Sequence, residues 1–561
     1  MGHERPGTRG PRWALGGTTP GTRMTAASSS RGSGSSGSRA VSVVALCVAA
    51  AFTGLGATGC RVNEDDIHRW ESTSHGPDKL KAVLYHEKYE TPLRVEAAVS
   101  LIRMKPRAGR RIGINIMVET LASVAPEARQ VIVASLVPAI IAELKKPAPV
   151  GQAGQPSPPD ASFAYKDAAF AMLTHDGTVI ISDEGLKANL KATLVEWAMS
   201  DFEHRLENRT QAYGMEQLLR YIGPTAVVGV PKLMTRDARR LDQMSGLVAE
   251  LGDEKTKTAA SQALVSIAQY VLSDEWTKIK KPELQAANAA SKLEPTEKQF
   301  TAQLAAYQDE ELMRVFGSMR KVGGRPAVDF ALDFAAKKDQ SEKRRQAALA
   351  ALEGRLDRNN PDDVKRILTI AGSDAPDVVL DQAFKRIGEM PREQVVDKLY
   401  ELFKTDKWKV RRAAAATVLK MSTVKNIDEF MAKLPEGGAA AKSFAMPEAL
   451  AYGALLNDLK EGKPLDALRK HFNTGSAAAR TSALSYWFNF GTKGDLPTVQ
   501  PFESDSTKVP VCETDPDCKW ACEVAKEGSK DRENKDLKTV GDFVKYCVEP
   551  AMEERAAEGK K

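Results

Sequence analysis

Four cysteines near the end of the chain are the residues whose type and spacing most clearly predict chemistry. The chain has 561 residues and six cysteines, of which Cys47 and Cys60 lie near the start. The other four are Cys512, Cys518, Cys522 and Cys547. Clustered cysteines in an exported chain form disulfides, and each disulfide typically stabilises a small module by about 2–4 kcal/mol. We therefore predict two disulfides in a C-terminal module.

Three pairings of these four cysteines are possible. Cys518 and Cys522 lie four residues apart and would share one face of a helix. If 517–526 and 539–555 form a helical hairpin, Cys518 and Cys547 lie about equally far from its turn. This geometry favours Cys518–Cys547 with Cys512–Cys522. The alternative is a zinc site with the four cysteines as ligands. Their spacing contains no C-x-x-C knuckle, so we predict no metal site.

No other group of residues predicts catalysis. The seven histidines include "HEKYE" at 86–90, which is not the H-E-x-x-H pair of a zinc helix. The glycines of "VGGRP" at 322–326 form no Walker loop, and no G-x-S-x-G elbow occurs. A haem would need C-x-x-C-H, which is also missing from the sequence. We predict a protein that is not an enzyme and has no cofactor.

The charge balance argues against a nucleic-acid partner. The formal net charge is +6, but six arginines and one acid lie before Cys60. The rest of the chain has 74 basic and 73 acidic residues, so it is close to neutral. A general nucleic-acid binder needs a basic face that displaces counterions. We predict no nucleic-acid binding.

The N-terminus has the layout of a targeting segment. Residues 1–39 are rich in Gly, Ser, Thr and Pro and are predicted to be disordered, and Met24 is a plausible alternative start. "AVSVVALCVAAAF" (40–52) forms an apolar region after Arg31 and Arg39, and small residues lead to Cys60. This is the layout of a secretory signal. An uncleaved membrane helix is disfavoured, because a span needs roughly 20 apolar residues.

The segment "ATGC" (57–60) resembles a bacterial lipobox, although Ala57 stands where leucine is commonest. The resemblance implies cleavage before Cys60 and a diacylglyceryl group on its thiol; a plain secretory signal is the alternative. Two or three acyl chains hold a protein firmly on a membrane. Arg61 stands where an inner-membrane retention signal would place an acid, which favours the outer membrane, facing the periplasm.

The chain after residue 67 reads as helix after helix. In "NPDDVKRILTIAG" (360–372), Asn360 is a good N-cap, Pro361 suits the first helical position, and Gly372 ends the helix. The only candidate strand is the short "GTVIISD" (177–183). Residues 186–223 suggest longer helices than the rest. We predict an all-α fold.

A weak internal repeat runs through these helices. A basic residue is followed three places later by Ala and four places after that by a large apolar residue. The clearest instances are Arg94–Ala97–Leu101, Arg345–Ala348–Leu352, Arg412–Ala415–Leu419 and Arg480–Ala483–Trp487. The last three arginines are 67 and 68 residues apart, which is nearly two units of about 34. The same spacing recurs once more at Leu380, Ala383 and Ile387, with an apolar residue in place of the basic one.

The segments "TPLRVEAAVSLIRM" (91–104) and "KWKVRRAAAATVLKM" (407–421) resemble the second helix of a HEAT repeat. The resemblance to the HEAT/armadillo family covers roughly 67–500 and implies an α-solenoid of stacked antiparallel helix pairs. It also implies that the repeated cation forms a ladder with acids of the neighbouring unit. The alternative is a groove that grips an acidic partner. The candidate groove residues are Arg344, Arg345, Lys409, Arg411 and Arg412.

These observations predict a domain order and a function. The predicted order is a leader and signal peptide (1–59), a lipidated tether (60–66), repeats (67–146), a Pro/Gly-rich linker or loop (147–162), repeats (163–500) and a disulfide-stapled helical cap (501–561). Solenoids mainly bind proteins, so we expect a non-enzymatic scaffold or adaptor for other envelope proteins. A binding module for a small molecule or glycan is the first alternative, and a repeat-containing enzyme is the second.

Overall fold

The computed structural model describes residues 62–106, 110–149, 159–207, 211–357, 359–459, 461–510, 516–525 and 532–558. Residues Val62–Lys561 form one compact unit. The predicted signal peptide, Cys60 and Cys512 lie outside the described residues. Within them, no helix combines the length and the apolar character that a membrane span requires.

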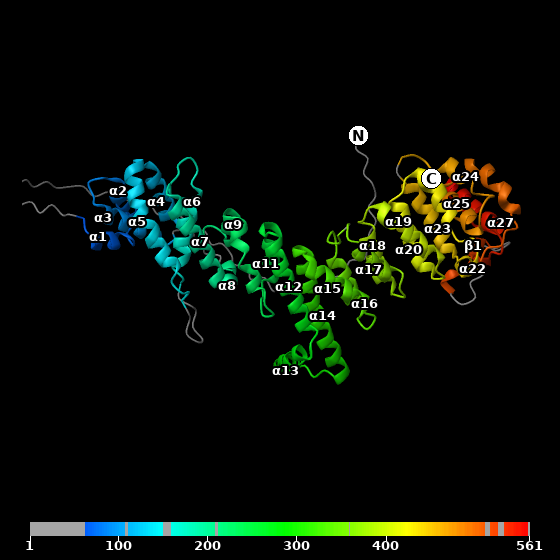
Figure 1. The fold of residues 1–561 in the computed structure, drawn as a ribbon, viewed down its shortest axis with the longest axis horizontal. Coiled ribbons are helices and arrows are strands. Elements are labelled where there is room, and N and C mark those ends of the chain that lie inside the picture. Colours follow the sequence, from blue (N-terminus) through cyan, green and yellow to red (C-terminus); the bar gives the residue numbers. More distant parts are fainter. Residues whose placement is uncertain are drawn as a thin grey trace, which may run out of the picture. The chain divides into compact units, whose positions relative to one another are not determined.

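The predicted all-α fold is confirmed, and the helices follow their sequence signals (Figure 1). The first helices are α1 (Glu64–Trp70), α2 (Gly76–Tyr85), α3 (Thr91–Arg103), α4 (Ile112–Ser123), α5 (Pro126–Leu144), α6 (Ser162–Thr174), α7 (Glu184–Ser200), α8 (Phe202–Glu207) and α9 (Met215–Ile222). The expectation of longer helices at 186–223 holds only for α7, which has 17 residues. The helices α8 and α9 have 6 and 8 residues, because Asp201 and Gly214 interrupt this segment. Residues 177–183 form no strand, although Ile180 and Ile181 are buried.

The middle of the chain contains the longest helix of the part described, α14, with 26 residues. The elements here are η1 (Pro224–Val227), α10 (Val230–Leu233), α11 (Leu241–Leu251), α12 (Glu254–Val271), α13 (Asp274–Ala290), α14 (Glu297–Val322), α15 (Arg325–Ala336) and α16 (Glu342–Ala351).

Shorter helices and turns follow up to residue 504. They are α17 (Pro361–Ala371), α18 (Asp377–Ile387), α19 (Arg392–Glu401), η2 (Leu402–Lys404), α20 (Trp408–Lys420), η3 (Val424–Asn426), α21 (Ile427–Lys433), α22 (Gly438–Lys442), α23 (Met446–Leu455), η4 (Leu456–Asp458), α24 (Leu465–Arg469), α25 (Ala477–Phe490), η5 (Lys493–Asp495), α26 (Leu496–Val499) and η6 (Gln500–Ser504). The side chain of Asn360 caps α17 as predicted, by accepting a hydrogen bond from the Asp362 N–H.

Most helices pack against the next helix and the next but one. Thus α2 contacts α3 and α4, α3 contacts α5, and α15 contacts α16 and α17. The second helices of successive pairs stack in the series α16, α18, α20, α23 and α25. This is how a solenoid covers apolar faces that an isolated pair would expose. Small residues permit close approach: a Cβ on Gly453 of α23 would lie 2.3 Å from the Ser485 carbonyl carbon of α25.

Ion pairs join neighbouring units at separations close to the repeat length. They include Arg103–Glu71 (32 residues apart), Arg220–Glu250 (30), Arg366–Asp333 (33) and Arg392–Glu429 (37). Most of these side chains are partly exposed, so each pair adds at most about 1 kcal/mol. Charged contacts between neighbouring units therefore exist, but they add little to stability.

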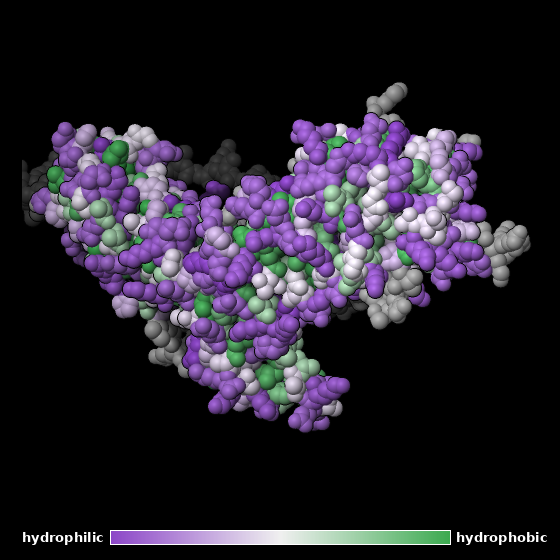
Figure 2. Space-filling view, turned by 45° about the vertical axis from the view of Figure 1, so that its right-hand side comes forward, coloured by the Kyte–Doolittle hydropathy of each residue, from purple (hydrophilic) through white to green (hydrophobic). Residues whose placement is uncertain are grey.

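A helical hairpin departs from this stacking. It consists of α13, the turn after it and the first half of α14, and we call residues 277–311 the projecting hairpin (Figure 1). In α13 only Trp276 and Asn288 are buried, and the buried residues of α14 begin at Leu312. Even so, the hairpin carries hydrophobic side chains among hydrophilic ones, at the bottom of Figure 2.

The C-terminal module differs from the prediction. Its elements are η7 (Pro516–Cys518), β1 (Ala521–Ala525), β2 (Arg532–Asp536), α27 (Val540–Phe543), η8 (Val544–Val548) and α28 (Glu549–Glu558). β1 pairs antiparallel with β2, so residues 521–525 are extended where we expected a helix. Residues 540–558 are helical, as expected for most of this stretch.

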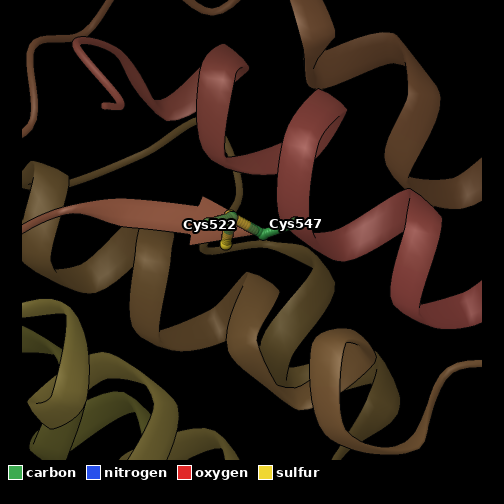
Figure 3. The surroundings of a disulfide bond; sticks show 2 residues. All are labelled: Cys522 and Cys547. Atoms are coloured by element: carbon green, nitrogen blue, oxygen red, sulfur yellow. A yellow bond between two sulfur atoms is a disulfide. The ribbon is translucent and has the colours of Figure 1, made fainter. Parts of the chain in front are cut away.

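The predicted disulfide pairing is wrong, because Cys547 pairs with Cys522 and not with Cys518 (Figure 3). Cys518 ends the turn η7 and Cys522 lies in β1, so the two do not share the helix on which the predicted pairing depended. Cys522 faces η8, whereas the Cys518 Sγ lies 3.3 Å from the Ser443 carbonyl oxygen. Cys518 is also disulfide-bonded, to a cysteine outside the described residues.

The module covers the end of the helical array. The Trp520 indole N–H donates to the Phe444 carbonyl oxygen at 3.0 Å, and its ring contacts Phe543. The Arg555 guanidinium binds the carbonyl oxygens of Trp487, Phe488 and Gly491 at the end of α25. Polar groups that an open helix end would expose are thereby satisfied.

Candidate protein-binding surface

The repeated cation of the sequence template caps the helix that precedes it. Arg94 donates to the carbonyl oxygens of Leu84 (2.9 Å) and Tyr85 (3.2 Å), in the last turn of α2. Arg345 likewise donates to the Ala335 carbonyl oxygen at 2.8 Å, in the last turn of α15. These carbonyls have no partner within their helix, and a positive charge is favourable there. In these two units the cation therefore holds its own helix pair together. Arg480 differs, because it pairs with Asp505, 25 residues further along the chain.

Position in the helix identifies these arginines better than the template does. Arg94, Arg345 and Arg480 are each the fourth residue of their helices. Arg129 is also the fourth residue of α5 and donates to the Ala122 carbonyl oxygen at 3.1 Å, although the template missed it. The proline that begins α5 is the signal that would have located it.

The template is one residue out of register in α20. This helix begins at Trp408, so its fourth residue is Arg411 and not Arg412. Arg411 donates to the carbonyl oxygens of Thr405 (2.6 Å) and Ser443 (2.9 Å). Its guanidinium also meets the Glu448 carboxylate through two hydrogen bonds, of 3.1 and 3.0 Å. Burial raises the pKa of Glu448 to about 7, and Arg411 opposes that rise.

Two of the five candidate groove residues are therefore buried. Arg345 is 4% exposed and Arg411 is 1% exposed, and both have internal partners. A buried guanidinium that is bonded to the protein's own carbonyls offers nothing to a partner. The prediction that these two arginines line a binding groove is wrong.

The other three candidates lie nearer the surface and also have partners. Arg344 binds Asp309 of α14 at 2.5 Å, Lys409 lies 3.3 Å from Asp377, and Arg412 lies over the Trp408 ring at 5.4 Å. The five residues come from α16 and α20, and α18 packs between these helices. They do not converge on one basic groove.

A buried charge cluster on α6 is the strongest alternative for a chemical site. The Lys166 ammonium and the Asp167 carboxylate are fully buried and lie 2.6 Å apart. Asp167 also accepts hydrogen bonds from the backbone N–H groups of Ala212 and Tyr213. Burial lowers the pKa of Lys166. Arg111, at the start of α4, also lies 3.3 Å from the Asp167 carboxylate. The cluster therefore ties α6 to both α4 and the 211–213 segment, and its charged groups are all engaged within the protein.

The projecting hairpin is firmly rooted in the array. Trp276 is buried at the start of α13, and its ring lies 6.0 Å from that of Tyr307. Gln308 donates to the Val271 carbonyl oxygen at 2.7 Å, and Arg344 binds Asp309. The root of the hairpin is therefore fixed by contacts to α12 and α16.

A buried amide pair and a tight turn shape the outer half of the hairpin. The side-chain amides of Asn288 and Gln303 exchange two hydrogen bonds, of 2.9 and 3.2 Å, across α13 and α14. The turn begins at Lys292, which has a φ of 55°. The Leu293 N–H reaches back to the Asn288 carbonyl oxygen, and the Lys292 N–H to that of Ala289. This is a Schellman motif with lysine where glycine is usual.

The hairpin displays apolar side chains although it is mostly exposed. Ile279, Leu293 and Tyr307 are 38%, 57% and 37% exposed. Ala286 and Ala289 lie exposed on α13 between the first two. Single exposed apolar residues are common on protein surfaces, but several on one small element indicate a contact site. The seven-residue spacing of Ile279, Ala286 and Leu293 is equally typical of a buried helix face, so the sequence did not distinguish this surface from a core.

Two hollows adjoin the hairpin. A hollow of about 420 Å³ lies at the root, and its lining includes Arg236, Arg314 and the covered Trp276. A second hollow of about 830 Å³ lies at the tip, between α13 and the start of α14. Its apolar lining residues are Ala289, Leu293, Pro295 and Phe300, and its charged ones are Lys281, Lys292, Glu294 and Glu297.

The family comparison covers part of the array and does not include the projecting hairpin. Residues 318–428 match the family model for HEAT repeats. No curated protein matches the chain. Among solved structures, the crystal structure of an engineered protein is similar at 13% identity over 76% of this chain and 98% of that one, with a TM-score of 0.21. A TM-score this low carries no functional information.

Proposed function

We propose that the chain is a non-enzymatic scaffold that holds other proteins of a bacterial cell envelope. A helical repeat fold with HEAT repeats at 318–428 supports this proposal, because such arrays typically bind proteins. The observation that carries it is the projecting hairpin, which exposes Ile279, Leu293 and Tyr307 instead of burying them in the array.

The second part of the proposal is a lipid anchor at Cys60. Cys60 follows an apolar segment and resembles the lipid-modified cysteine of bacterial lipoproteins. Lipid on Cys60 would hold the array at the membrane, with the outer membrane as the proposed location. Metabolic labelling with a lipid precursor tests this: we expect label on the wild type and none on Cys60→Ala. Equal labelling of the two would refute the anchor without affecting the scaffold.

The binding role is tested by trapping partners in intact cells. A photo-crosslinking amino acid replaces the exposed Ala286 in one strain and Lys365, an exposed residue of α17, in a matched control. We expect specific crosslinked bands from position 286 and fewer from position 365. The same few bands from both positions, or none from either, would count against a hairpin that binds protein.

The root hollow favours the small-molecule alternative, because Tyr270 and Trp276 line it. The support is weak for a physical reason. Trp276 is 2% exposed, and the Arg236 guanidinium already lies 4.7 Å from the Tyr270 ring centre. A ligand would find little aromatic surface to stack on, so the scaffold remains the better proposal.

A further inference from the structure

The charged residues around the tip hollow lack partners. Arg344 and Arg366 of the array pair with acids, whereas exposed lysines such as Lys365 and Lys385 form no ion pair among the described residues. The tip hollow differs in bringing unpaired charges of both signs together: no described residue forms an ion pair with its lining residues Lys281, Lys292, Glu294 and Glu297. The hollow is therefore bordered by two free positive and two free negative charges.

The apolar part of the tip offers both a hollow and a side chain that could fill one. Phe300, Pro295 and Ala289 line the hollow, and its volume of about 830 Å³ exceeds that of a single side chain. Leu293 is one of the lining residues and is 57% exposed. One surface thus presents an exposed leucine together with a hollow whose lining is part apolar and part charged.

We infer that this surface binds a second copy of the same chain, tip to tip. This inference rests on the proposed function, because it identifies one partner of the hairpin. In a two-fold symmetric contact each patch meets its own copy, so the patch must complement itself. A patch with two lysines, two glutamates, an exposed leucine and a hollow meets that condition. Leu293 of each chain would enter the partner's hollow, while lysines of one chain meet glutamates of the other.

The charge pattern disfavours a partner of uniform charge. A partner with a uniformly acidic surface would satisfy Lys281 and Lys292 but would be repelled by Glu294 and Glu297. A basic partner has the opposite difficulty, because like charges brought together at an interface weaken binding. A second copy supplies both signs in matched numbers.

The contact is small and therefore weak. The hollow has ten lining residues, whereas a standard interface uses about 20–30 residues on each side. We expect a dissociation constant of roughly micromolar or weaker in solution. Tethering on one membrane would raise the effective concentration and favour pairing.

Charge exchange between two variants tests the contact. The full-length chain is produced with two different tags in one cell, and co-purification of the tags is measured after mild detergent extraction. One variant carries Lys281→Glu and Lys292→Glu, and the other carries Glu294→Lys and Glu297→Lys. We expect each variant to lose self-association about tenfold or more, because like charges now face each other. We expect the two variants together to recover it. The control, Lys365→Glu with Lys385→Glu on the array, should behave as the wild type.

Recovery in the mixture cannot come from misfolding, because misfolded variants would fail together as well as alone. Loss without recovery would overturn the inference, as would undiminished self-association of either variant. If position 286 traps other proteins while the tags never co-purify, the scaffold stands and the second copy is wrong. If neither occurs, both proposals fail.

Discussion

The projecting hairpin and the array that follows it use the same residue types in opposite ways. In the array, Arg345 and Arg411 are buried and bonded to backbone carbonyls, whereas Lys281 and Lys292 of the hairpin are exposed. Alanines follow the same contrast, since Ala348 is fully buried and Ala286 is exposed. Array helices pack against helices on several sides, whereas in the hairpin few residues of α13 are buried and the buried residues of α14 begin only at Leu312. Neighbours, more than residue type, decide whether a side chain supports the fold or remains available for binding.

The largest effect that would test this contrast is the loss of Arg411. Arg411→Ala leaves the Glu448 carboxylate buried without its partner, so we expect the free energy of unfolding at pH 8 to fall by about 3–5 kcal/mol. Urea unfolding followed by circular dichroism measures it. The neighbouring Lys409, which is partly exposed, provides the control: Lys409→Ala should cost at most about 1 kcal/mol.

The same variant has a predictable pH dependence. The folded pKa of Glu448 is already raised to about 7 by burial, above its usual value of 4.5, and losing Arg411 raises it further. A carboxyl with a raised folded pKa destabilises the protein increasingly as pH rises above 4.5. The defect of Arg411→Ala should therefore be smaller at pH 5 than at pH 8. An equal defect at both pH values would show that Glu448 is not the cause.

The disulfide of the cap should give the next largest effect and should be confined to the cap. Cys522→Ala with Cys547→Ala opens a loop between residues 25 apart, which should cost roughly 2–4 kcal/mol. Hydrogen exchange read by mass spectrometry should become faster within 516–558 and stay unchanged in α15 to α18. Faster exchange through those helices as well would mean that the cap and the array unfold together.

The capping arginines should have an intermediate effect. Arg345→Met keeps the apolar stem and removes the hydrogen bond to the Ala335 carbonyl, so we expect a loss of about 1–3 kcal/mol. Lys343→Met, on the exposed face of the same helix, is the matched control and should change stability by no more than about 0.5 kcal/mol. Similar losses from the two would remove the distinction between buried and exposed cations.

The smallest effect, a gain, concerns the hairpin turn. Lys292 adopts a positive φ of 55°, and this backbone conformation costs a non-glycine residue roughly 1 kcal/mol. Because glycine avoids that cost, Lys292→Gly should slow hydrogen exchange in the turn and in the last turn of α13. Lys278→Gly places the same substitution inside α13 and should speed exchange, because glycine costs about 1 kcal/mol there. Changes of the same sign would contradict the left-handed turn.

Local signals made much of the array predictable. The ends of α17 were predicted from Asn360, Pro361 and Gly372. The repeat spacing also placed Leu380 correctly, because it is the fourth residue of α18, the position that arginine occupies in other units. These predictions depend on neighbours within one or two turns of helix. The template failed by one residue at Arg411 because "KVRR" offers two adjacent arginines, and only the start of α20 distinguishes them.

Features that depend on distant partners were not predictable. Ile279 and Tyr307 have the types and spacing of core residues, and their exposure follows only from the lack of a neighbouring helix. Residues 521–525 contain good helix formers, yet pairing with β2 and the bond from Cys522 to Cys547 make them extended. The hairpin and the disulfide pairing therefore required the structure.

The packing of each helix on its nearest neighbours also has a consequence for the order of folding. Contacts such as α2 with α4, or α16 with α18, join residues close in sequence, so each unit can fold soon after it is synthesised. The cap is different, since Trp520 and Cys518 contact residues 76 and 75 positions earlier. Closing so long a loop is slow, and so we expect the array to form first and the cap to dock last.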